Sequence, residues 1–388
     1  MPAFWVNPVA PSDPSYEGIV NAAIELINST RLSNPVHIAD LTLLELQDAT
    51  GRYVVIIKRA GAQLSVPASS DSPLALHQPH FLQRVLLTTK YGLVPDSPIP
   101  PWIIGPSSYE ADLAPFLPNP LIFKTGGEAD PTHVHFCRAL LEVEREREFV
   151  EELATEIVDV ACSVPSTEHD WLVEQLMGAI LAQRLENFYL DLYRIFEFFF
   201  PLTSIFSLKS RLGFSDTELT LLSHCRESLN WNINHHTGVR GASAYGSLAF
   251  AETILGSFQP DNEDPAQIDE QRQRYKTKAC EVLAEARHTL THQDFCRKSL
   301  DATQLTTLCR AMLQFLSSAF QEYSRRLTAN RAANPVIAAA EASAKSEVPA
   351  NQPNPVVIRA RTSGLTIRWG RRVRFAGRAR RAKRIQPR

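Results

Sequence analysis

The residues with the clearest chemical potential lie in one short stretch, Ala284–His292, which reads Ala-Glu-Ala-Arg-His-Thr-Leu-Thr-His. Arg287 precedes His292 by five positions, and a second histidine, His288, directly follows the arginine. A histidine changes its charge near neutral pH and can therefore move protons during a reaction. Arginine keeps its positive charge and offers a planar fork of N–H donors to the oxygens of an anion. These side chains therefore predict proton transfer beside a negatively charged group.

A second pattern lies upstream, where the apolar segment Leu192–Phe200 contains the run Tyr193-Arg-Ile-Phe-Glu197. The two patterns together resemble the HEPN family (higher eukaryotes and prokaryotes nucleotide-binding). The signature of that family is an Arg, a polar residue and a His, with four to six residues between the Arg and the His. Many members begin with a helix that carries a Tyr-Arg-x-x-Glu-like pattern. The resemblance covers residues 165 to 328, some 40% of the chain, and implies an all-α bundle.

The resemblance implies cleavage of RNA without a metal or a cofactor, in which the ribose 2′-OH attacks the adjacent phosphorus. The products end in a 2′,3′-cyclic phosphate and a 5′-OH. Such a reaction needs a group that moves protons and a cation that stabilises the charge on the phosphate. We expect His292 to move the proton and Arg287 to hold the phosphate. His288 is expected to orient the phosphate or the other two side chains.

Three other interpretations remain open at this point. The helical part could be a non-catalytic HEPN-like module that binds RNA or a protein, or a scaffold with no nucleic-acid role. In a third, Arg287 and His288 are solvated surface groups and His292 merely ends a helix. The presence of both Arg287 and His292 favours the enzyme, because binding alone does not require that pair.

The spacing of Arg287 and His292 raises a geometric difficulty. Five positions at about 100° per residue place the two side chains about 140° apart on an ideal helix. They can converge if the helix ends or distorts near Thr291, or if two copies of the chain meet. HEPN nucleases resemble the second case, since an isologous contact brings two motifs into one cleft. We therefore expect a homodimer through the HEPN-like part.

Two further groups of polar residues were weighed as sites. His133-Val-His135-Phe-Cys137 could be read as zinc ligands, but alternate residues share a face only on a strand, and this segment is expected to open a helix. His235 and His236 belong to a polar segment, 232–238, which is expected to be a surface loop and could alternatively line the cleft. The chain has no G-x-S-x-G, P-loop or G-x-G-x-x-G pattern.

The formal net charge of −2 conceals a strong division of charge. Residues 359–388 hold 12 of the 40 Lys and Arg residues and no acid, so the rest has 28 basic against 42 acidic residues, a net charge of −14. This basic tail could be a disordered arm that binds nucleic acid; an artefact of the reading frame would have the same composition. The side chains expected to contact RNA there are Arg368, Arg371, Arg372, Arg374, Arg378, Arg380, Arg381, Lys383 and Arg384.

The composition, with 44% apolar and 21% charged residues, is that of a globular α+β protein with more than one domain. We expect residues 1–15 to be an extended lead-in, 16–130 a small mixed α/β domain of unknown role, 131–164 a charged connecting helix, 165–328 the HEPN-like all-α domain, 329–356 a linker and 357–388 the arginine-rich tail. The N-terminal domain would sense a signal, bind a protein partner or restrain the nuclease, as in defence or toxin-like proteins of the family.

Local patterns predict the individual elements. Strands are expected at His37–Leu46 and Arg52–Val66, around a turn at Asp48–Gly51, with helices at Tyr16–Thr30 and His80–Tyr91 and a proline-rich loop at Val94–Pro120. In the second half, helices are expected at Trp171–Phe200, Gly241–Phe258 and Ala266–His292, and from a cap at Asp301-x-x-Gln304 to near Leu327. The last of these helices has one apolar stripe, formed by Leu305, Leu308, Met312, Phe315, Leu316, Ala319, Phe320 and Tyr323.

The six cysteines are scattered and form no C-x-x-C pair. Several fall on apolar helix faces, where a reduced thiol packs as a small hydrophobic group. The first residues lack the pattern of a signal peptide, so we expect a cytoplasmic protein. The apolar segment Phe188–Phe206 carries Asp191, Arg194, Glu197 and Pro201, which predicts a buried helix of a soluble domain and no contact with a membrane.

Overall fold

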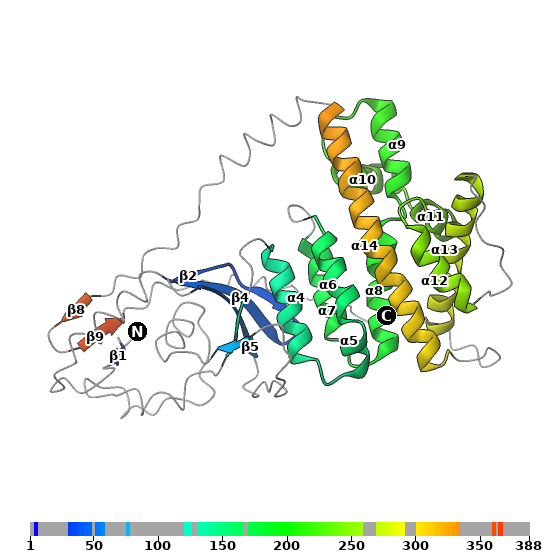
Figure 1. The fold of residues 1–388 in the computed structure, drawn as a ribbon. Helices are drawn as coiled ribbons and strands as arrows, with labels where there is room; N and C mark the ends of the chain where they lie inside the picture. Colours follow the sequence, from blue (N-terminus) through cyan, green and yellow to red (C-terminus); the bar gives the residue numbers. More distant parts are fainter. Residues whose placement is uncertain are drawn as a thin grey trace, which may run out of the picture. The chain divides into compact units, whose positions relative to one another are not determined.

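The computed structural model describes residues 4–6, 30–48, 51–58, 75–77, 120–125, 130–165, 170–258, 269–291, 300–333, 359–361 and 364–367. Within these residues an antiparallel sheet is followed by a long succession of helices (Figure 1), which confirms the expected α+β class. The helices expected at Tyr16–Thr30 and His80–Tyr91, and the loop at Val94–Pro120, lie outside the described residues except for Thr30 and Pro120, neither of which is in a helix or strand.

The chain divides into two compact units. In the first, which comprises residues 1–28, 80–118 and 351–388, β1 (Phe4–Val6) pairs with β9 (Gly364–Ile367), and β9 pairs with β8 (Arg359–Arg361), both antiparallel. The second unit comprises residues 29–79 and 119–350 and contains the main sheet and all the described helices.

The main sheet is antiparallel and has the strand order β2-β4-β5-β7-β6, with β3 also paired to β4. Its central pair, β4 and β5, is in register from Leu41–Lys58 to Asp48–Gly51. Residues 53–57 of β5 are buried without interruption, as expected for a strand covered on both faces. The strands are β2 Arg31–Leu32, β3 Val36–Ile38, β4 Leu41–Asp48, β5 Gly51–Lys58, β6 Ala75–His77 and β7 Leu121–Lys124.

The prediction of one strand over His37–Leu46 was wrong. The chain turns at Ala39 and Asp40, where Ala39 has a φ of 50°, so that β3 folds back onto β4 as a short hairpin. The run of apolar residues does not reveal such a turn, although Ala39 and Asp40 are of types that are depleted in strands. The second predicted strand is confirmed as far as Lys58, and residues 59–66 lie outside the described residues.

The helices are α4 Thr132–Val143, α5 Glu148–Glu152, α6 Ala154–Ser163, α7 Asp170–Ile180, α8 Leu185–Phe198, α9 Leu202–Leu212, α10 Glu218–Leu229, α11 His235–Ala242, α12 Leu248–Phe258, α13 Asp269–Thr291 and α14 Ala302–Ala333. Three predicted helices are interrupted in the structure. The charged helix over 131–164 is divided into α4, α5 and α6, and the helix over 171–200 into α7 and α8. The helix over 241–258 is divided into α11, which begins earlier than predicted, and α12.

The break between α7 and α8 has a tertiary cause. Arg184, the residue before α8, has an extended backbone (φ −129°, ψ 144°). The guanidinium of Arg147, which precedes α5, donates to the carbonyl oxygen of Ala182 and so satisfies an acceptor at the end of α7. Neither glycine nor proline marks this break in the sequence, so periodicity could not predict it.

The helix α14 is close to its prediction. The side chain of Asp301 accepts from the backbone N–H of Gln304 at 2.7 Å, and the Gln304 side chain accepts from the Asp301 N–H at 3.2 Å, which completes the predicted cap. The predicted apolar stripe of α14 is buried throughout, and the helix extends to Ala333 where Leu327 was expected. Four of the cysteines, Cys137, Cys225, Cys280 and Cys309, are buried free thiols, as predicted, and Cys296 lies outside the described residues.

One core connects the sheet to the helices, because α4 packs on β4 and β5 and its buried residues join those of α6, α7 and α8. The aromatic residues of α8 meet α14 edge to face, with ring centroids 4.8 Å apart for Phe196 and Phe315. None of the helices in the described part of the chain is long and apolar enough to cross a membrane.

The buried residues of α4 are apolar except for His135 and Glu142. The side chain of His135 is fully buried, and neither of its ring nitrogens has a hydrogen-bond partner among the described residues. Burial lowers the pKa of His135, and the opposing effect of the nearby Glu45 carboxylate does not offset it. The folded protein therefore holds this imidazole neutral.

We expect His135→Leu to make the free energy of unfolding less dependent on pH below about 6.5. A histidine whose pKa is lowered by folding takes up its proton more readily in the unfolded chain, so wild-type stability falls as the pH falls, by at most about 1.4 kcal/mol per pH unit for one proton. Urea denaturation at pH 7.5 and pH 5.5 measures the difference. His224→Leu, at an exposed position, is the control, and equal slopes for wild type and His135→Leu would contradict the prediction.

Candidate functional site

Arg287 lies in the last turns of α13, at the edge of the face that this helix buries. The buried residues of α13 are Ala279, Cys280, Leu283 and Ala286, so Arg287 follows the last of them and is itself half-buried. Its guanidinium carbon lies over the ring of Tyr193 in α8, 5.9 Å from the ring centroid. This is cation–π contact at the outer limit of the usual distance.

Three polar residues of α8 lie on the helix face that is directed toward Arg287. Tyr189, Tyr193 and Glu197 are spaced by four residues and therefore share a face. The hydroxyl of Tyr189 donates to the carbonyl oxygen of Leu283 at 2.6 Å, one helical turn before Arg287. Burial raises the pKa of both tyrosines well above the ordinary value, so both phenols stay protonated. Tyr189 thereby holds α13 so that Arg287 meets Tyr193.

His235 joins the same cluster from the first turn of α11. Its Nε2 lies 2.9 Å from the hydroxyl of Tyr193, and the two rings are stacked at 21°. Burial lowers the pKa of His235, and the positive charge of Arg287 lowers it further. Because the Tyr193 phenol is the protonated partner, it donates to Nε2, and the neutral imidazole carries its own proton on Nδ1.

Close packing between α11 and the end of α8 brings His235 to this position. The side chain of Asn234 caps α11 by accepting from the His236 N–H at 2.9 Å. A Cβ atom at Gly238 would lie 2.5 Å from Cδ2 of Phe200, so only glycine lets the helix approach that ring. The ring of Phe200 in turn contacts the edge of His235, with centroids 5.5 Å apart.

Further charged groups surround the cluster. Glu197 and His288 act on the pKa of His235 in opposite directions, the carboxylate raising it and the second imidazole lowering it. His236 lies 3.8 Å from a carboxylate oxygen of Glu281, across the contact between α11 and α13. None of the described carboxylates lies within ion-pair distance of the Arg287 guanidinium. The site therefore combines an arginine beside an aromatic ring with a neutral histidine, an arrangement able to bind an anion.

The structure describes some of the predicted site residues and not others. Arg287 and His288 are described, and α13 confirms the helix that was expected to carry them, from Asp269 onward. His292 lies outside the described residues, as do the nine arginine and lysine side chains of the tail, Arg368, Arg371, Arg372, Arg374, Arg378, Arg380, Arg381, Lys383 and Arg384.

The loop predicted over residues 232–238 ends at Asn234, because α11 begins at His235. His235 was weighed only as a residue that could line a cleft, and the structure places it beside Tyr193. The segment with His133, His135 and Cys137 is helical, as expected. Among the described residues, no three His, Cys, Asp or Glu side chains gather as metal ligands do.

Comparison with known proteins gave no relative: no protein-family model matches the chain, and neither a curated protein nor a solved structure is significantly similar to it. The chemistry of the cluster therefore has to follow from its own residues.

Proposed function

We propose that the chain is a metal-independent endoribonuclease of HEPN type, with Arg287 holding the scissile phosphate. The observation that carries this proposal is the cluster in which Arg287 lies over the ring of Tyr193, whose hydroxyl is hydrogen-bonded to the neutral imidazole of His235. An arginine without a described carboxylate partner has both edges of its guanidinium to offer to phosphate oxygens. The resemblance of the Arg287–His292 segment to the HEPN signature agrees with such a role.

In this mechanism the 2′-oxygen of one ribose attacks the adjacent phosphorus while the bond from phosphorus to the 5′-oxygen breaks. A proton leaves the 2′-OH, and another reaches the departing 5′-oxygen. His292 is the proposed proton-transfer group, and Arg287 stabilises the charge that builds on the non-bridging oxygens. His235 holds its Nε2 on Tyr193, so its Nδ1–H can donate to the same phosphate, and His288 helps to orient it.

We further propose that two copies meet at this cluster. Arg287 is turned toward α8, whereas the exposed His288 lies on the next position around α13. On an ideal helix His292 falls about 140° from Arg287, so a twofold contact would let each copy complete the other's site. A nuclease of this kind fits a defence or toxin-like system in which the N-terminal region restrains the activity.

A non-catalytic HEPN-like module that binds RNA or a protein is the second candidate. It is favoured by the fact that the cluster of Arg287, Tyr193 and His235 is sufficient for binding an anion without any proton transfer. The two candidates differ in whether labelled RNA is cut or only retained.

Arg287→Ala and His292→Ala are each expected to lower RNA cleavage by about 10²–10⁴-fold, the usual cost of losing a proton-transfer or charge-stabilising group. Arg287→Lys should also lose most activity, because an ammonium cannot offer a planar fork to two oxygens. Cleavage of a labelled RNA in EDTA, with analysis of the 2′,3′-cyclic ends, measures this. Arg274→Ala, an exposed arginine of the same helix, is the control.

Cleavage of DNA, or a requirement for added metal, would contradict this chemistry, since DNA has no 2′-OH. Retention of RNA without cleavage by the wild-type chain would favour the non-catalytic module instead.

Tyr193→Phe separates the two contacts of Tyr193, because it keeps the ring under Arg287 and removes only the hydroxyl. That hydroxyl donates to the neutral form of His235, so its loss should raise the pKa of His235. Histidine NMR titration of both proteins tests this. An unchanged His235 pKa would show that the hydrogen bond has no influence on the site.

The basic tail is expected to add sequence-independent affinity that falls steeply with salt, because its cations displace counterions from phosphates. Truncation after Ala350, the last residue of the second unit, should weaken RNA binding at low salt and flatten the plot of log affinity against log salt. Circular dichroism should show the helices retained. Equal binding by the full and truncated chains at low salt would exclude a role for the tail.

A further inference from the structure

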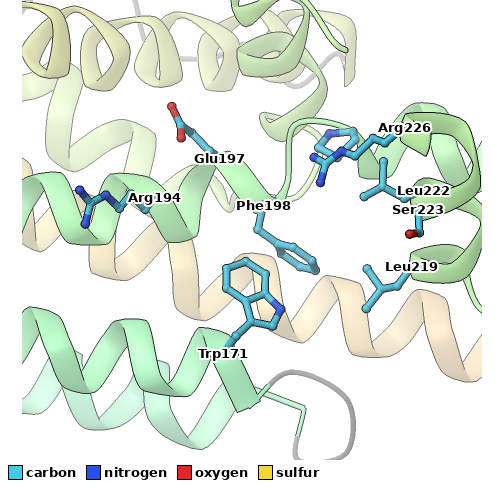
Figure 2. A pocket seen from close by; sticks show the side chains of 9 residues that line it. Trp171, Arg194, Glu197, Phe198, Leu219, Leu222, Ser223 and Arg226 are labelled. Carbon is cyan, nitrogen blue, oxygen red and sulfur yellow. The ribbon is translucent and has the colours of Figure 1, made fainter. Parts of the chain in front are cut away.

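A pocket of about 430 Å³ lies where α7, α8 and α10 meet (Figure 2). This volume is within the roughly 300–1,000 Å³ of typical small-ligand sites. Figure 2 shows Trp171 and Phe198 facing the leucines of α10, with Glu197 and Arg226 farther out. The lining residues are Trp171, Arg194, Glu197, Phe198, Pro201, Leu219, Leu222, Ser223 and Arg226.

Trp171 is exposed to an unusual degree for so large an aromatic residue. Its exposed fraction is 47%, although its indole contacts the ring of Phe198 edge to face, with centroids 5.7 Å apart at 71°. This contact fixes the indole on one side while much of the side chain stays open to solvent. A fixed and exposed aromatic ring is the platform on which single-stranded nucleic-acid binders stack bases.

The charged residues at the pocket add an anion site beside this platform. Arg226 lies in the last turn of α10, is exposed, and is not within ion-pair distance of any described carboxylate. Arg194 is paired with Asp191 at 2.7 Å but remains 66% exposed. The Glu197 carboxylate is an acceptor at the same pocket. An aliphatic ligand would leave these polar side chains without a partner. A nucleotide has a phosphate that the arginines can bind and a base whose amine the Glu197 carboxylate can accept from.

Glu197 also connects the pocket to the candidate site. It lies one helical turn after Tyr193 on the same face of α8, and its charge raises the pKa values of Tyr193 and His235. An extended RNA strand bound at Arg287 could therefore place a neighbouring base in the pocket, which lies next to Glu197.

We propose that this pocket holds one unpaired nucleobase of a single-stranded RNA, stacked on Trp171, with an adjacent phosphate on Arg226. Glu197 accepts from an exocyclic amine of the base, and Arg194 adds to the attraction for the strand. The inference rests on the proposed function, since it names the class of RNA that the same region binds. Duplex RNA is excluded from the pocket because its bases are paired and stacked inside the helix.

The test uses the full chain and an unstructured 12-nucleotide RNA with 2′-O-methyl groups, which can bind but cannot be cut. Fluorescence anisotropy is expected to show about 5- to 150-fold weaker binding for Trp171→Ala, the range of a lost base stack, and substantial rescue by Trp171→Phe. Arg226→Ala should weaken binding and reduce the salt slope by about 0.7, the value for one phosphate contact with a single strand.

Two matched controls are expected to bind as wild type does. Leu212→Ala removes an exposed apolar side chain, and Arg274→Ala removes an exposed arginine, both away from the pocket. The effect of Trp171→Ala should persist at 300 mM salt, where the tail contributes little, and should disappear when the same sequence is presented as a duplex.

Equal affinities of wild type and Trp171→Ala for the single strand would overturn the inference, and so would an equal loss for single strand and duplex. This binding test and the cleavage test of the proposed function can give different results. Arg287-dependent cleavage with no effect of Trp171→Ala would leave the nuclease and remove the base pocket, whereas Trp171-dependent binding without any cleavage would leave the pocket on a non-catalytic module.

Discussion

The burial of the aromatic residues of α8 is the constraint on which the rest of the helical part depends. These residues pack against α14 on one side. A buried polar atom on another side of α8 needs a hydrogen-bond partner inside the protein. The Tyr189 hydroxyl does so on the backbone of α13, and the Tyr193 hydroxyl on the His235 side chain of α11. Two helices far apart in the sequence are thus held by hydrogen bonds that the core requires, and the candidate site forms where they meet.

Local signals predicted those parts of the fold that are determined locally. The capping pattern at Asp301 and the apolar stripe of α14 were sufficient for one long helix, because a cap and a 3.6-residue period are properties of the helix itself. The breaks that divide the other predicted helices depend on distant groups instead. Arg147 satisfies the carbonyl of Ala182, 35 residues later, and no pattern around Ala182 records that contact. Periodicity therefore found the helices but not where they are interrupted.

The same distinction applies to the candidate site. Arg287 and His288 could be chosen from the sequence, because their residue types and their place in one helix are local facts. His235 could not be joined to them, since it lies 42 residues after its hydrogen-bond partner Tyr193. Gly238 was the available signal: a glycine inside a helix weakens it and so calls for a close contact. Which ring makes that contact, Phe200, is visible only in the folded chain.

The charge distribution limits how the proposed RNA ligand would be held. Without residues 359–388 the chain carries a net charge of −14, which repels a polyanion at long range. At physiological ionic strength that repulsion is screened beyond about 8 Å, so contacts at shorter distance decide the affinity. Arg287 and Arg226, which have no described carboxylate partner, are the cations proposed for such contacts. The Tyr193 ring beside Arg287 is buried, whereas the Trp171 indole at the pocket of Arg226 is exposed. On the proposed function, RNA would therefore be held by a few specific contacts, and the basic tail would raise the local concentration of the strand.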